Sequence, residues 1–426
     1  MKDENILYWI WLSLRCTVGT KDFRRIVEKY DDPFDVYRLE EEEIERLEGV
    51  SPSLKLKLMD RSLEEAYSVL KYCKHKRVDI IPYNHKLYPA RLRSIEDPPV
   101  LLYVAGKMPD MNDRLCVAMV GTRKVSEYGR DTAYRMAYEL ASAGAVIVSG
   151  MALGVDGIAA CGALASGGET VAVLGCGISV VYPKNHTKLK DGIVKQGAVI
   201  TEYPPFEAPH GYNFPKRNRI ISGLCQGVVV IEGSSSSGAL ITASRAVEQG
   251  RELFALPGKV GEENSEGPNE LIKNGALVAL SADDVIDHFD FLYHTCIDYG
   301  GLRKSKKDAF PVEKALDKYG LSEKPSKRSR IRAEEITTES RPVEGQQKAE
   351  KRAEPISAEC DNSEKTLEGL DENCRKVFSA MPLDKAVTPD GFEVEGISIA
   401  DVITALTMLE ISGLVQSLPG GMYIRK

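Results

Sequence analysis

Six short apolar runs, each followed by a glycine-bearing turn, constrain the fold of this 426-residue chain more than any other feature of its sequence. The runs are almost entirely apolar, which is typical of strands buried on both faces of a parallel sheet. Because helical stretches separate them, the pattern predicts a doubly wound, Rossmann-like α/β sheet. We expect this core to fill residues 75–290. The runs read "VAMVG", "AVIVSG", "TVAVLGCG", "GAVITEY", "GVVVIEG" and "ELFALPG".

A small helical domain of the SAM or helix-hairpin-helix kind is expected before the core, in residues 1–74. Three short stretches there carry apolar residues at helical spacing, separated by "DDPFD" and "EGVSPS". The segment "LEGVSPSLKLKL", residues 47–58, has two interpretations. It is either half of a helix-hairpin-helix, whose turn amides bind a phosphate, or a plain turn between two helices.

Two further regions follow the core. Residues 300–365 are charged, contain prolines and have almost no aromatic residues, which predicts a disordered linker. Residues 366–426 predict a winged-helix-like domain, with helices near Cys374–Ala380 and at Ile399–Ile411 before a hairpin that turns at residues 419–421. This last region holds five Lys and Arg against nine Asp and Glu. Phosphate repels such a surface, so we expect a protein-contact or regulatory role for it.

Composition limits the compartment and the possible partners. The net charge of −7 means that a nucleic-acid partner would have to bind a local cationic patch on an acidic body. The nine cysteines stand singly, which predicts reduced thiols and no metal site. The apolar stretch 6–14 is shorter than the roughly 20 residues that span a bilayer, and it lacks the features of a signal peptide. We expect a cytoplasmic protein that needs no membrane and no cofactor.

Cationic residues gather where a doubly wound sheet binds its ligands, beyond the carboxyl ends of the strands. Arg123 follows the first run, Lys184 follows the third, and "FPKRNR", residues 214–219, stands where another helix is expected to begin. Helix N-termini and forked arginine side chains both bind phosphate oxygens. The pattern favours a polyphosphate or a nucleic-acid backbone as the ligand. The alternative is a solvated charged turn. For Asn218 a second role stays open, as a cap of the helix.

Common enzyme signatures are incomplete in this chain. Gly175 and Gly177 begin a dinucleotide-type fingerprint, but Val180 stands where its third glycine is needed. The serines at 234–237 form no GxSxG elbow, and no HExxH motif or evident carboxylate pair is present. We therefore expect a binding protein with no catalytic residues.

Taken together, these stretches resemble the DNA-processing protein A family (DprA, also called Smf) over about residues 75–290. The resemblance implies an extended Rossmann core that binds single-stranded DNA, forms a homodimer and helps to load the RecA recombinase during natural transformation. It implies no catalytic reaction. The matching stretches are "YPARLRSIEDPPVLLYVAG", "VGTRKVSEYG", "SGMALGVDGIAACGAL", "TVAVLGCGISVVYPKNH", "TEYPPFEAPHGYNFPKRNRIISGL", "SSSSGALITASRAVEQGRELFALPG" and "GPNELIKNGA".

The resemblance also implies which residues form the DNA pocket. One position departs from the family, because Ala160 stands where a histidine is often found. For Phe214 two roles stay open, stacking on a base or packing beneath its helix. The implied pocket residues are Gly121, Arg123, Ser149, Gly150, Lys184, Phe214, Arg217, Asn218, Arg219 and Gly238.

Two other functions compete with DNA binding. Phosphoribohydrolases that resemble lysine decarboxylase bind a nucleoside monophosphate on a similar sheet and use a "PGGxGTxxE" loop with a catalytic Glu. The corresponding loop here reads "SSSSGALITASRA" and has no Glu at that spacing. The second alternative is a protein-interaction scaffold with incidental cationic turns, which absence of DNA binding at low salt would favour.

Overall fold

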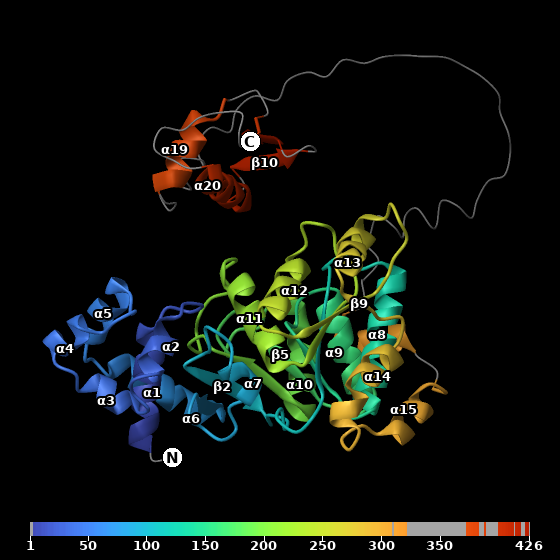
Figure 1. The fold of residues 1–426 in the computed structure, drawn as a ribbon, viewed down its shortest axis with the longest axis horizontal. Coiled ribbons are helices and arrows are strands. Elements are labelled where there is room, and N and C mark those ends of the chain that lie inside the picture. The colour runs from blue at the N-terminus through green and yellow to red at the C-terminus, as the bar shows by residue number, and fades with distance from the viewer. Residues whose placement is uncertain are drawn as a thin grey trace. The chain divides into compact units, whose positions relative to one another are not determined.

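The structure is a computed structural model that describes residues 3–308, 311–321, 372–382, 387–388, 399–412, 414–418 and 422–425 (Figure 1). The chain divides into two compact units, Met1–Ile331 and Arg332–Lys426. The helical N-terminal region and the α/β core therefore belong to one unit.

The core is built on a nine-stranded sheet with the order β1-β2-β6-β5-β4-β3-β7-β8-β9. The strands from β3 to β9 pair in parallel, which confirms the predicted doubly wound fold. β1 and β2 add an antiparallel edge that the sequence analysis did not predict. The strands are β1 Asp79–Pro82, β2 Leu101–Gly106, β3 Cys116–Val120, β4 Val146–Ser149, β5 Thr170–Val173, β6 Ala198–Thr201, β7 Gly227–Val230, β8 Glu252–Ala255 and β9 Leu277–Val278.

Helices cover both faces of the sheet, so every central strand is buried on two sides. In β3, Val117 and Met119 pack toward α8, α9, α10 and α14, whereas Ala118 and Val120 pack toward α7, α11 and α12. This alternation explains why the central strands are apolar at almost every position. The core helices are α7 Ala90–Arg93, α8 Glu127–Ser142, α9 Val155–Ala165, the 3-10 turn η1 Lys184–His186, α10 Thr187–Gln196, α11 Asn213–Leu224, α12 Gly238–Glu248, α13 Glu263–Lys273 and α14 Ala282–Tyr293.

The order of the strands reverses between β3 and β7. From β3 the chain continues through β4, β5 and β6 on one side of the sheet, then returns to β7, β8 and β9 on the other. The connections after β3 and β7 therefore leave in opposite directions. In open α/β sheets such a switch point forms a crevice at the carboxyl ends of the strands.

The N-terminal region forms six short helices, among which α1, α2 and α4 correspond to the predicted stretches. The turn between α4 and α5 contains Gly49 with φ +71°. The Ser51 amide and hydroxyl, at the start of α5, donate to the Asp22 carboxylate at 2.9 and 2.7 Å. Because this amide is already satisfied within the protein, the structure favours a plain turn. The helices are α1 Asp3–Arg15, α2 Asp22–Val27, α3 Pro33–Tyr37, α4 Glu41–Glu45, α5 Pro52–Met59 and α6 Glu64–Lys76.

The prediction of a disordered linker from residue 300 is wrong for its first part. Helices α15, Tyr299–Ser305, and α16, Val312–Tyr319, lie there. They bury Leu302, Leu316 and Tyr319. A single apolar stripe is enough to hold an otherwise charged helix on a core, and the high charge of the segment concealed it. The rest of the predicted linker lies outside the described residues.

The second unit contains α19 Glu372–Ala380, α20 Ile399–Ile411 and a hairpin of β10 Val415–Leu418 and β11 Met422–Arg425. Both helices and the hairpin agree with the sequence analysis, and Val402, Leu406 and Leu409 of α20 are buried as expected. The predicted hairpin turn lies outside the described residues. The winged-helix assignment stays a prediction.

Among the described residues, none of the helices has the length and apolar character that a membrane span requires. No group of three or more His, Cys, Asp or Glu residues in the same part of the chain could hold a metal ion.

Candidate nucleic-acid interface

Two adjoining cavities of about 610 and 120 Å³ open at the carboxyl ends of β3 and β7. We call them together the carboxyl-edge pocket, because Arg123, Tyr182, Phe214 and Arg217 line both cavities. The pocket lies at the switch point of the sheet, where the fold class predicts a ligand.

Most of the residues predicted for a DNA pocket line this space. Ser149 does not line it, because its side chain is buried at the end of β4. Arg219 does not line it either. The predicted residues that do are Gly121, Arg123, Gly150, Lys184, Phe214, Arg217, Asn218 and Gly238.

The loop that presents Arg123 is held by the buried carboxylate of Glu232, which follows β7. This carboxylate accepts hydrogen bonds from the Ser126 amide at 2.9 Å and from the Ser126 hydroxyl. A side chain at Gly129 would bring its Cβ within 2.3 Å of the Glu232 Cδ. The carboxylate of Glu232 therefore has its hydrogen-bond partners within the loop, whereas Arg123 and Lys124 remain exposed at the pocket.

Arg217 forms the floor of the pocket. Its guanidinium donates to the carbonyl of Gly150 at 2.9 Å and to the carbonyl of Val173. Burial lowers the pKa of Arg217, and the charge of Asp156 opposes that effect. Arginine nevertheless remains protonated in proteins, and neutral carbonyls do not cancel its charge. Residue 150 has to be glycine here, since a Cβ would lie 2.5 Å from Nη2 of Arg217.

Asp156, at the start of α9, is the one carboxylate among the described residues that line the pocket. It accepts the Gly150 amide at 2.9 Å, and burial raises its pKa despite the opposing charge of Arg217. Cations outnumber this single carboxylate, so the pocket attracts anions. The cations are Arg123, Lys124, Lys184 and Arg217.

Two aromatic rings stand beside these cations. The half-buried ring of Phe214 lies 5.3 Å from the exposed ring of Tyr182, centroid to centroid, at an interplanar angle of 33°. The Arg217 guanidinium carbon is 5.9 Å from the centroid of Phe214. A Cβ on Gly175 would lie 2.8 Å from the Phe214 ring, so the glycine makes room for it. The ring thus packs against its neighbours and also lines the pocket.

Two helices direct their N-terminal turns at the pocket. α12 begins at Gly238, and its N-cap residue Ser237 accepts the Ala239 amide at 3.3 Å. α11 begins at Asn213, so "FPKRNR" lies inside the helix. The sequence analysis placed this segment at the point where the helix begins. Asn218 is consequently not its cap. At the start of α11 the amides of Asn213 and Phe214 already donate to the carbonyls of His210 and Gly211, and Pro215 has no N–H. The contribution of the two helix N-termini is therefore their dipoles, which favour an anion.

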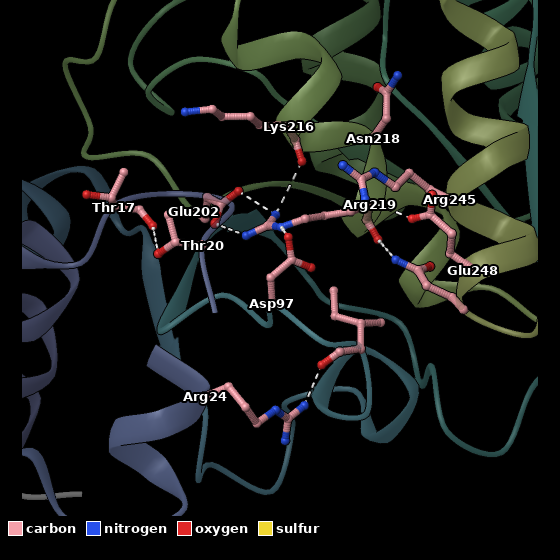
Figure 2. Close-up of polar contacts among 12 residues, drawn as sticks. Thr17, Thr20, Arg24, Asp97, Glu202, Lys216, Asn218, Arg219, Arg245 and Glu248 are labelled. Atoms are coloured by element: carbon pink, nitrogen blue, oxygen red, sulfur yellow. Dashed lines mark hydrogen bonds and ion pairs between the residues drawn. The ribbon is translucent and has the colours of Figure 1, made fainter. Parts of the chain in front are cut away.

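Arg219 is the clearest error in the predicted site. Its two Nη atoms each lie 2.7 Å from a carboxylate oxygen of Glu202, and its Nε lies 3.0 Å from Asp97 (Figure 2). Burial alone would lower the pKa of Arg219, but these carboxylates raise it above its usual value. Residues 217 and 219 are two positions apart, about 200° around a helix, so they face different sides.

Sequence reasoning missed four residues of the site: Lys124, Tyr182, Asp156 and Glu232. Lys124 follows Arg123 directly in the sequence. Tyr182 had a usable signal, because it stands two positions before Lys184 in the same turn. The two carboxylates had no such signal, since their roles depend on contacts with distant loops. Ala160, the departure from the family pattern, is buried in α9 and lines neither cavity.

The fold and the pocket together define a Rossmann-like protein with a cationic crevice at its switch point. The family model described as DNA recombination-mediator protein A matches residues 79–290. The chain is 37% identical over 238 residues to DNA processing protein DprA of Bacillus subtilis, covering 55% of this chain and 80% of that protein. It is 28% identical over 430 residues to Protein Smf of Synechocystis, covering 100% of both chains.

A solved structure agrees with these matches. The X-ray structure of DNA processing protein A from Streptococcus pneumoniae superimposes with a TM-score of 0.58 at 35% identity, covering 67% of this chain and 98% of that chain. The chain belongs to the DNA processing protein A family, which confirms the resemblance inferred from its sequence.

Proposed function

We propose that the carboxyl-edge pocket binds the phosphate backbone of single-stranded DNA without reading its sequence. The proposal rests above all on the charge of the pocket. Arg123, Lys124, Lys184 and Arg217 surround the space, and its one described carboxylate, Asp156, is buried and has a raised pKa. Phosphate contacts supply most of the sequence-independent affinity for nucleic acids.

The aromatic rings favour a single strand over a duplex. Unpaired bases expose their faces, and proteins that bind single strands stack these faces on aromatic side chains beside a cationic groove. Tyr182 and Phe214 provide such rings next to Lys184 and Arg217. In a duplex the bases are stacked on one another, and the rings would have no partner.

Further parts of the proposal rest on the family resemblance. The protein would protect the bound strand and help to load the RecA recombinase on it, as in natural transformation. It would act as a homodimer in the cytoplasm, and it would catalyse no reaction.

A salt series tests the binding mode. If about four phosphates are contacted, log K should fall against log salt with a slope of about −3 for a single strand. Affinity should then decrease roughly 50-fold between about 50 and 200 mM salt, equally for oligonucleotides of different sequence. A flat salt response would contradict a phosphate-dominated pocket. Release of free base from a nucleoside monophosphate would instead favour the phosphoribohydrolase alternative.

A further inference from the structure

A second, larger cavity of about 920 Å³ lies between α2 and the C-terminal end of α12. We call it the α2–α12 cavity. Its lining is strongly charged and joins the N-terminal helices to the α/β core within one compact unit. The cations in its lining are Lys21, Arg24, Arg25, Arg245 and Arg251, and the carboxylates are Glu28, Glu96, Asp97 and Glu248.

Among the described residues, two of its arginines have an exposed carboxylate as their only ion-pair partner. Arg25 lies 3.3 Å from Glu28, and Arg245 lies 2.8 Å from Glu248. All four side chains are between 44% and 54% exposed. Exposed pairs of this kind contribute about 1 kcal/mol or less. A phosphate group could therefore replace either carboxylate at little cost.

Two other arginines of the lining form no ion pair with any described residue. Arg24 donates to the carbonyl of Arg93 at 2.7 Å and to that of Ile95, and Arg251 donates to the carbonyl of Arg91 at 3.0 Å. The Nε of Arg251 is buried and has no acceptor among the described atoms. Carbonyl partners orient these guanidiniums without cancelling their charge, so both add a positive field to the cavity.

The α2–α12 cavity is close to the carboxyl-edge pocket along one helix. Ile241 and Thr242 of α12 line the pocket, and Arg245, three residues further on, lines the cavity. Three residues of an α-helix advance about 4.5 Å. Figure 2 shows Arg245 with Glu248 on α12, and Arg24 on the N-terminal side. A strand that leaves the pocket along α12 would reach Arg245 first and α2 next.

We propose that the α2–α12 cavity is a second phosphate-binding site for the same DNA strand. The strand would run from the carboxyl-edge pocket along α12. Its phosphates would displace Glu248 from Arg245 and Glu28 from Arg25 and pair with the two arginines. The N-terminal helical region would thereby form part of the path for longer strands. This inference rests on the proposed function.

The test compares two strand lengths. Oligothymidylates of about 6 and about 20 nucleotides span the range of typical single-strand sites. An Arg25→Ala/Arg245→Ala protein loses two cations, and its salt slope for the longer strand should be less negative by about 1.4. Its affinity for that strand should fall about 25-fold at about 0.1 M salt and stay unchanged for the short one. The control is Arg46→Ala/Lys76→Ala, which removes two exposed cations that line neither site.

A second variant should change the affinity for the longer strand in the opposite direction. Glu28→Gln/Glu248→Gln releases both arginines and should bind the longer strand several-fold more tightly. Equal affinity of all variants for the longer strand would overturn the second site and leave the pocket function intact. An equal loss on both strands would also overturn it, since the effect would then lie in the pocket. A wild-type protein that binds neither strand would contradict the proposed function, and this inference with it.

Discussion

The two sides of α11 carry arginines two positions apart that do different work. Arg217 faces the carboxyl-edge pocket, where its partners are the carbonyls of Gly150 and Val173. Arg219 faces the region around Glu202 and Asp97, where its partners are carboxylates. Both side chains are almost completely buried, at 4% and 2% exposure.

The difference shows that burial does not decide whether a cation serves binding or stability. Its partners decide. Carbonyl oxygens satisfy the hydrogen bonds of Arg217 and leave its charge available to a ligand. Glu202 neutralises Arg219, so that side chain joins α11 to the sheet and adds little field to the pocket.

The largest effect is expected from Arg219→Ala. Removing this cation leaves Glu202 buried and unpaired, which should lower the free energy of unfolding by about 3–5 kcal/mol. Denaturant unfolding measures the loss, while the fraction that remains folded should bind DNA almost normally. Replacing both partners, as Arg219→Met/Glu202→Gln, should cost less. If Arg219→Ala left the free energy of unfolding unchanged and abolished DNA binding, the proposed difference between Arg217 and Arg219 would be wrong.

The next effect concerns the exposed cations on the pocket side. Arg123→Ala/Lys184→Ala should weaken single-strand binding about 25-fold at about 0.1 M salt, because two phosphate contacts are lost. Stability should change by about 0.5 kcal/mol or less, since both side chains are on the surface. Fluorescence anisotropy and thermal melting give the two numbers. An unchanged affinity would show that the DNA does not bind in the carboxyl-edge pocket.

Phe214→Ala separates the two roles of this ring. We expect a loss of about 1 kcal/mol in binding free energy, roughly fivefold in Kd, at the low end of stacking because the ring is half covered. Phe214→Tyr keeps an aromatic face and serves as the control. A Phe214→Ala protein that binds normally but melts earlier would show that packing alone needs the ring.

The pH dependence of binding tests Asp156. Burial raises the pKa of this carboxyl, so it takes up a proton sooner than an exposed Asp as the pH falls. Protonation removes the negative charge of the one described carboxylate in the pocket lining. DNA affinity should therefore rise a few-fold as the pH falls from about 7 to 5. Asp156→Asn should bind more tightly at neutral pH and lose this part of the response. Retention of the full response in Asp156→Asn would assign it to other groups.

The smallest effect is expected from deleting residues 366–426. The region is acidic, with five Lys and Arg against nine Asp and Glu, and should add little affinity for phosphate. Single-strand binding should stay within a few-fold of the full chain. A much larger loss in a truncated protein that is folded and has the same oligomeric state would show that DNA also contacts this region.

The fold could be predicted from the sequence because its signals are local. Continuous apolar strands and glycine turns recur along the α/β core, and they indicate buried parallel strands without knowledge of any distant contact. β2 reads LLYVAG and carries the same signal, but its antiparallel pairing with β1 and β6 has no local mark in the sequence. α16 was not predicted because its single apolar stripe lies in a charged segment.

The candidate site was predictable only in part. Arg123 lies just after β3, and Lys184 lies in the connection that follows β5, so the sequence by itself determined that they stand at the carboxyl edge. Only the tertiary structure decided that Arg219 leaves the pocket, because each residue of a helix turns the side chain by about 100°. It also decided the carbonyl partners of Arg217 and the enclosure of Glu232. Those contacts join residues far apart in the chain, and their geometry exists only after the helices have packed on the sheet.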